Sequence, residues 1–156
     1  FGEYSIQFKE IIKDLGFKYA FGQHSGVIDE TKDLWELPRF PINEKYGELK
    51  RFKSIVNYIP FYYKKIYPKE NYLTDENNPP DVFVEFFPEQ NNLKNITCYS
   101  NENNKWRKSK INFENNHKLK ILIEEKFTTE RGRINCSLND IEGWRWFGIQ
   151  FVIKEN

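Results

Sequence analysis

The chain has 156 residues, enough for one domain or two small ones, and 38% of them are hydrophobic and 17% aromatic. This composition supports packed cores and argues against a disordered polypeptide. The 24 basic and 23 acidic residues nearly cancel, so no broad positive charge indicates nucleic-acid binding. No apolar run approaches the roughly 20 residues of a membrane-spanning helix, and no signal-peptide pattern opens the chain. The absence of Met favours a processed chain or a fragment of a longer protein.

The first helix is predicted just after Ser5, a residue type that caps helix N-termini. Apolar residues then recur at helical spacing and define one stripe: Phe8, Ile11, Ile12 and Leu15. Gly16 stands where helices often end. Short strands are expected at residues 17–22 and 37–40, with a polar turn between Gly22 and Gly26.

A second helix is expected after Asn43, which can serve as its N-cap, and Pro60 stops it. Its predicted buried stripe is Leu49, Phe52, Val56 and Ile59. Helix, strand, strand and helix in this order are typical of an α/β barrel or a doubly wound sheet. Two short strands cannot close a barrel, so we expect residues 1–62 to be a barrel remnant that exposes strand edges.

Beyond this region, apolar residues no longer recur at helical spacing but at every second position. Residues 63–80 hold an Asn- and Pro-rich cluster and are expected to be a linker. In residues 81–156, six segments alternate apolar and polar residues, most cleanly at 147–153. The segments are 82–87, 93–100, 105–113, 119–123, 132–138 and 147–153. We therefore expect an all-β sandwich of six or seven strands, and an α+β protein as a whole.

Both cysteines fall in strand-like runs, on the same face as apolar neighbours. Two buried free thiols at Cys98 and Cys136 are the favoured interpretation. A disulfide between two strands is the alternative, and it requires an oxidising compartment and closely spaced Cβ atoms. With two isolated histidines, His24 and His117, the chain offers no structural zinc site.

Two residues of the first region could belong to a chemical site. His24 lies in a glycine-flanked turn, where a plain polar turn residue is the favoured interpretation over a catalytic acid or metal ligand. Arg39, at the end of an expected barrel strand, could hold a carboxylate by two charge-assisted hydrogen bonds. An interdomain salt bridge explains Arg39 equally well, and both interpretations stay open.

Four segments of the first region resemble the closing section of polysaccharide deacetylases of the NodB-homology type. The segments are residues 1–5, 14–17, 20–28 and 37–43. The segments 132–137 and 143–148 resemble the β-sandwich extension that follows the barrel in some members. The resemblance covers most of the chain and is most specific before residue 44.

The resemblance implies a metal-dependent amidohydrolase that removes acetyl groups from N-acetylated sugars. A divalent metal such as zinc, held by one Asp and two His, polarises the carbonyl and activates water, and a second Asp acts as the base. The Thr-Phe-Asp-Asp and His-x-x-x-His motifs that carry these groups are absent. We therefore expect this chain to bind no catalytic metal and to be inactive alone. Tyr4 is expected near the substrate cleft, and Arg39 is expected to hold a catalytic carboxylate in place.

A carbohydrate-binding module is the alternative function. Trp144 and Trp146 fall on one face of the last expected strand, opposite its core face, and Trp106 lies on a neighbouring segment. Exposed aromatic faces on a sheet can stack against sugar rings. Packing of these tryptophans against the barrel remnant is the favoured explanation. A purely structural envelope protein is a third interpretation.

The expected partners follow from these interpretations. A polysaccharide or oligosaccharide is expected, with no nucleic acid and no membrane span. Self-association is expected as well, because a severed barrel would leave apolar helix faces uncovered. The resemblance favours the cell envelope, the periplasm or the exterior as the location.

Overall fold

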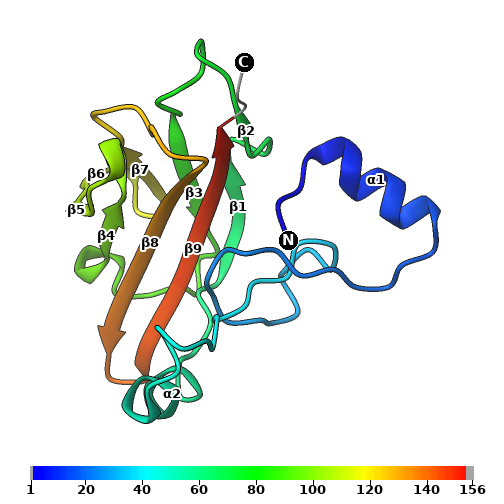
Figure 1. Ribbon diagram of the computed structural model, residues 1–156. Helices are drawn as coiled ribbons and strands as arrows, with labels where there is room; N and C mark the ends of the chain where they lie inside the picture. The colour runs from blue at the N-terminus through cyan, green and yellow to red at the C-terminus, as the bar shows by residue number, and fades with distance from the viewer. Residues whose placement is uncertain (1, 154–156) are drawn as a thin grey trace.

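The computed structural model describes residues 2–153, and the chain is a mixed α+β protein dominated by strands (Figure 1). Within this range there are two α-helices, two short 3-10 turns and nine strands in two sheets. The predicted α+β class is therefore confirmed. No helix among the described residues is long and apolar enough to cross a membrane.

The strands divide into a four-stranded and a five-stranded sheet. The first has the order β1 (Tyr63–Tyr67), β3 (Val82–Phe86), β7 (Lys118–Leu122), β6 (Lys110–Asn115). The second has the order β2 (Tyr72–Leu73), β9 (Gly143–Ile153), β8 (Arg131–Asp140), β4 (Thr97–Ser100), β5 (Arg107–Lys108). All pairings are antiparallel except that of β2 with β9. The 3-10 turns η1 (Leu93–Asn95) and η2 (Glu102–Asn104) flank β4.

The two sheets enclose one hydrophobic core, as expected for a sandwich. Alternate residues of β3, β7, β8 and β9 point inward and are almost fully buried, among them Val84, Phe86, Ile121, Ile134 and Phe151. Each such side chain stabilises the fold by about 1.5–3 kcal/mol relative to an exposed position. Phe61, from the segment that precedes β1, is also fully buried in this core.

The two cysteines correct the prediction of free thiols. Cys98 on β4 and Cys136 on β8 are register partners, with their Cα atoms 4.1 Å apart, and they form a disulfide. Their burial on the core face was predicted correctly. The period-two pattern gives the face of each strand but not which strands are neighbours, so the pairing could not be derived from it.

The segment 63–80, expected as a linker, supplies β1 and β2, one strand to each sheet. The expected strand 105–113 is in fact two strands, because the chain passes from one sheet to the other at Ser109. The buried hydroxyl of Ser109 lies 2.9 Å from that of Ser100, which fixes this crossing point. The remaining predicted strands appear as β3, β4, β7, β8 and β9 with shifted ends.

The first helix, α1 (Ile6–Asp14), forms as predicted, but its apolar stripe is largely exposed. Ser5 accepts a hydrogen bond from the Phe8 amide, and Gly16 follows the helix at a φ of +82°, a conformation that favours glycine. Only Ile12 is buried. In Figure 1, α1 stands apart from the sandwich, in agreement with the exposure of Phe8, Ile11 and Leu15.

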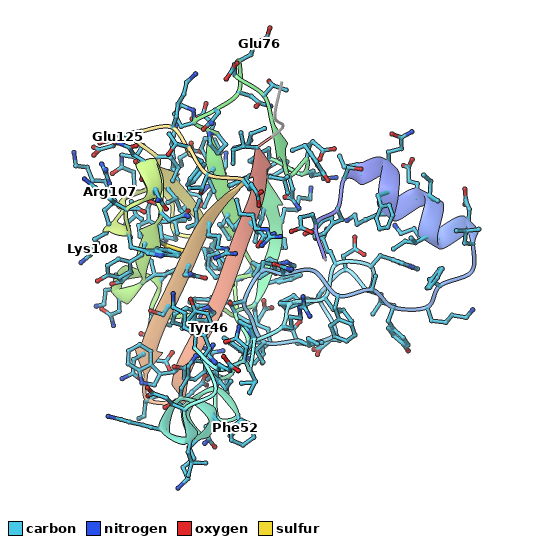
Figure 2. The ribbon with its side chains drawn as sticks, in the orientation of Figure 1. Tyr46, Phe52, Glu76, Arg107, Lys108 and Glu125 are labelled. Atoms are coloured by element: carbon cyan, nitrogen blue, oxygen red, sulfur yellow. A yellow bond between two sulfur atoms is a disulfide. The ribbon has the colours of Figure 1, made fainter. Side chains whose placement is uncertain are left out.

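The second helix, α2 (Leu49–Ile55), is shorter than expected and begins after Glu48 rather than Asn43. Asn43 instead accepts a hydrogen bond from the Tyr46 amide in a turn before the helix. The stripe predicted to be buried is wrong, because Leu49, Phe52 and Val56 are exposed. Phe52 is labelled in Figure 2 on the outside of the molecule.

The two strands expected in the first region are reduced to a single parallel bridge between Phe21 and Leu37. The region is instead attached to β9, through bridges from Gly26 to Phe147 and from Ile59 to Arg145. Arg145 is buried, donates to the Pro60 carbonyl and forms an ion pair with Glu142. A barrel remnant in residues 1–62 therefore stays a prediction.

Candidate functional site

A groove of about 730 Å³ crosses the outer face of the five-stranded sheet. Its floor comes from β8 and β9, the long hairpin at the front of Figure 1, and its walls come from residues 23–25 and 39–58 and from Trp106. Tyr46, labelled in Figure 2, lies over this hairpin close to α2. The groove thus joins the first region of the chain to the sandwich.

Register fixes the polar floor of the groove. Since alternate residues of a strand share a face, the odd-numbered residues of β8 and the even-numbered residues of β9 point outward. Arg133 pairs with Gln150, Asn135 with Gly148, and Ser137 with Trp146. These cross-strand pairs place a cationic group at one end of the floor and an indole at the other.

Gly148 allows the loop around Ser25, which forms one wall of the groove, to pack closely on β9. The backbone of Ser25 crosses directly over it, and a Cβ added at Gly148 would lie 2.8 Å from the Ser25 carbonyl oxygen. Such a contact is too short for any side chain, so only glycine allows the loop to lie this close. The loop that carries His24 is therefore held against β9.

Aromatic rings cluster at the indole end of the groove. The Trp146 ring stacks on Tyr58, with centroids 6.0 Å and planes 10° apart, and Phe40 meets both rings edge-on. Trp106, on the segment before β5, is 53% exposed and lines the same groove. Flat, partly open aromatic faces of this kind are suited to stacking against sugar rings.

The charged lining of the groove is entirely cationic. Four arginines line it, Arg39, Arg51, Arg131 and Arg133, whereas none of its described lining residues is Asp or Glu. Arg51 donates to the carbonyls of Pro41 and Tyr46, at 2.8 and 2.7 Å. Arg131 forms an ion pair with Glu3, outside the lining. A ligand with acceptor groups, or with negative charge, suits this lining.

Two polar atoms of the groove lining are left without partners. The indole N–H of Trp146 and the side-chain carbonyl oxygen of Gln150 are buried and have no hydrogen-bond partner within residues 2–153. Gln150 is only 7% exposed. Because an unpaired buried polar group destabilises a fold by about 1–3 kcal/mol, such groups are candidates for a binding role.

A second hollow, of about 460 Å³, lies between α1, the first loop region and β1. Lys9 crosses it to bind Asp33 and Glu36 at 2.7 and 2.5 Å. Burial alone would lower the pKa of Lys9, but these two carboxylates outweigh it and leave the pKa above its usual value. The ion pairs hold α1 against the loop, so a structural role accounts for these charges.

His24 and Tyr4 lie together in this second hollow, with their rings 6.3 Å apart. His24 is enclosed between the two hollows, and burial, assisted by the Lys9 charge, lowers its pKa to about 4. Burial and the nearby Glu36 raise the pKa of Tyr4. At neutral pH both side chains are therefore uncharged.

The predicted site residues separate into three places. Arg39 and Trp146 line the groove together. Tyr4 belongs to the second hollow. Trp144 shares the outer face of β9 with Trp146 but lies beyond the groove, near the β8–β9 turn, and is 47% exposed. Trp146 packs on Phe40 and Tyr58 of the first region, as the favoured explanation expected for the tryptophans, whereas Trp106 and Trp144 are about half exposed.

Sequence reasoning missed most of the groove. Arg133 could have been identified from the period-two pattern of residues 132–138, because it stands next to the buried Ile134 and faces the opposite way; Arg131 shares that face two residues earlier. Tyr46, Arg51 and Tyr58 carry no such signal, since they belong to irregular or helical segments that meet β9 only in the folded chain.

The described residues form no cluster that fits the divalent metal implied by the resemblance. Across the described residues, no group of three or more His, Cys, Asp or Glu side chains could hold a metal ion. His24 is enclosed, and the charge that acts on its ring is that of Lys9. We derive no metal-dependent step from this chain. Comparisons with the profiles of protein families, with curated proteins and with solved structures find no match.

Proposed function

We propose that this chain binds a polysaccharide in the groove across β8 and β9, as the accessory part of a polysaccharide deacetylase of the NodB-homology type. The observation that carries the binding proposal is the groove's combination of open aromatic faces with arginine and amide side chains. Trp106 and Trp146 supply stacking surfaces, and Asn135 supplies hydrogen bonds from the floor. Sites for sugars need both kinds of contact, because a pyranose has apolar faces and a polar rim.

The size and position of the groove support the same proposal. A volume of about 730 Å³ lies within the roughly 300–1,000 Å³ of typical ligand sites. The groove is open at the surface, so a polymer can cross it without threading an end. It also lies where the sandwich meets the first region, which in this proposal adjoins the catalytic barrel.

The deacetylase part of the proposal is supported by the segments before residue 44 and by the uncovered helices. Exposed apolar residues concentrate in the first region, including Phe8, Ile11 and Leu15 on α1 and Leu49 and Phe52 on α2. Monomeric proteins rarely leave such faces open. In this proposal another surface of the parent enzyme covers them, and the catalytic metal and base belong to that enzyme rather than to this chain.

Paired tryptophan variants test the binding proposal. Trp106→Ala removes an exposed indole from the groove, whereas Trp144→Ala removes one of similar exposure outside it. We expect Trp106→Ala to weaken oligosaccharide binding about tenfold, or about 1.4 kcal/mol, and Trp144→Ala to leave it unchanged. Isothermal titration calorimetry with a panel of hexasaccharides measures this difference. Equal losses in both variants would locate the binding elsewhere.

The deacetylase proposal has its own tests. The coding sequence upstream of this segment should encode a Thr-Phe-Asp-Asp-like motif, and a parent sequence without it would remove the proposal. The chain alone should release no acetate from chitooligosaccharides when zinc is added. Rapid metal-dependent release would mean that the active site lies within these residues.

A further inference from the structure

We propose that the groove selects polysaccharides whose repeating unit carries a negatively charged group such as a carboxylate. This inference rests on the proposed function, since it requires that a sugar polymer binds there at all. It goes beyond that function because stacking on aromatic rings does not distinguish a neutral sugar from an acidic one. The selecting groups are Arg133 and Arg51, neither of which forms an ion pair with a carboxylate of residues 2–153.

Arg133 and Arg51 carry this selection. Arg133 projects from the floor beside Gln150 and has no ion pair with any residue in the range 2–153. Arg51 is oriented by the carbonyls of Pro41 and Tyr46, which fix its position without neutralising its charge. Both guanidinium groups thus line a groove in which none of the described lining residues is Asp or Glu.

The strand register places Arg133 well away from the aromatic cluster. Arg133 pairs with Gln150, and Trp146 is four residues from Gln150 along β9. At a rise of about 3.3 Å per residue, the two ends of the floor are about 13 Å apart. A ligand that contacts both Trp146 and Arg133 must be longer than one sugar, with one ring stacked on the aromatic cluster and an acidic group at Arg133.

The physical preference for an anion follows from the way arginine binds. A guanidinium can donate two parallel hydrogen bonds to one carboxylate, and such charge-assisted bonds are about twice as strong as neutral ones. A neutral hydroxyl offers neither the charge nor the second acceptor. Because none of the described lining residues is Asp or Glu, an acidic ligand meets no like charge from them.

A single-stranded nucleic acid is the main competing anion, because it too combines bases that stack with a charged backbone. The observations favour a glycan. The chain has a formal net charge of +1, and the groove concentrates its arginines locally. Nucleic-acid sites instead follow a phosphate backbone with an extended basic surface.

Two hexasaccharides that share the same N-acetylated sugar test the inference. Chitohexaose contains N-acetylglucosamine only, whereas a hyaluronan hexasaccharide alternates it with glucuronate. We expect the hyaluronan fragment to bind about tenfold tighter at low ionic strength. This advantage should shrink as salt is raised, because screening weakens ion pairs near the surface. Isothermal titration calorimetry at two salt concentrations measures both effects.

Substitutions at Arg133 assign the selectivity to the groove. Arg133→Gln should reduce the affinity for the hyaluronan fragment about tenfold, and should reduce the affinity for chitohexaose by much less. Arg133→Lys keeps the charge but loses the paired donors, so it should give an intermediate loss. The matched control is Lys108→Gln, which removes a cation from β5 outside the groove and should change nothing. Lys108 is labelled at the far edge of the sheet in Figure 2.

Each result has a distinct meaning. If neither hexasaccharide binds, the proposed function and this inference both fail. If both bind equally and Arg133→Gln has no effect, the groove remains a sugar site but the inference is wrong. Tighter binding of a single-stranded oligonucleotide than of either sugar would overturn it in favour of nucleic acid. Urea unfolding of each variant confirms that the fold is intact, and Arg133→Lys remains informative if Arg133→Gln is unstable.

Discussion

The indole of Trp146 and the phenol ring of Tyr58 lie nearly parallel, 6.0 Å apart, and join β9 to the segment that follows α2. The contact connects two parts of the chain with different sequence patterns. It also forms one end of the groove, so the same two rings hold the fold together and line the candidate binding site.

We expect this pair to be energetically coupled. In a double-mutant cycle with Tyr58→Ala and Trp146→Ala, the coupling free energy should be about 0.5–1.5 kcal/mol, the usual value for stacked aromatic side chains. Urea denaturation, followed by far-ultraviolet circular dichroism, gives the four free energies of unfolding. The same cycle with Trp144→Ala, which lies outside this contact, should give none. A zero value for Tyr58 with Trp146 would mean that the rings merely touch.

The Cys98–Cys136 disulfide should contribute substantially to stability. It closes a loop of 38 residues in sequence, which by loop-closure entropy stabilises the folded chain by about 2–4 kcal/mol. The double variant Cys98→Ala, Cys136→Ala should lose this amount in urea unfolding. Dithiothreitol should destabilise the native chain to a similar extent and leave the double variant unaffected. If dithiothreitol left the urea midpoint of the native chain unchanged, the disulfide would not be present in the folded protein.

The half-buried His24 predicts a fall in stability at mildly acidic pH. Its folded-state pKa of about 4 lies below the ordinary value of 6.5, so between these values the unfolded chain binds the proton and the folded chain does not. The free energy of unfolding is therefore highest above about pH 6.5 and decreases as pH falls toward 4. This decrease amounts to about 3 kcal/mol at most.

His24→Gln should flatten this part of the pH profile. The free energy of unfolding of the native chain and of the variant, measured between pH 7 and pH 4.5, gives the comparison. His117→Gln, in the turn between β6 and β7, serves as the matched control and should keep the native slope. Parallel profiles for all three proteins would place the His24 ring in contact with water.

The exposed apolar face of α1 predicts self-association of the isolated chain. Phe8, Ile11 and Leu15 lie open on this helix, and burying them in a second copy would remove apolar surface from water. Analytical ultracentrifugation should show a concentration-dependent rise in mass. Phe8→Lys should reduce it, whereas Phe113→Lys, also at an exposed site but on β6, should not. A chain that remains monomeric at high concentration would contradict the prediction.

The sequence predicted the fold best where burial follows a local pattern. Residues 147–153 alternate so regularly that β9 and its core face were expected, and Ser5 correctly marked the start of α1. β1 was missed because its residues Tyr63–Tyr67 sit at one side of the sheet and show no alternating burial. The buried stripe of α2 was wrong because helical spacing shows which residues share a face, but not whether another surface covers that face.

The candidate site was harder to predict than the fold. Trp146 and Arg39 were selected for separate reasons, and nothing in the sequence placed them in one groove. Their meeting depends on the loop around Ser25 crossing β9, and on a tertiary contact at Tyr58. Sites built from distant segments have this property in general, because the groups that form them come together only through packing.

The absence of a Cβ atom at Gly148 determines how closely the loop around Ser25 packs on the sheet. A methyl group at this position would push the Ser25 backbone away from β9. It would lift the loop that forms a wall of both hollows, while every side chain along the groove kept its identity. Gly148→Ala is thus a way to alter the shape of the groove without altering its chemistry, and so to separate what its geometry does from what its arginines do.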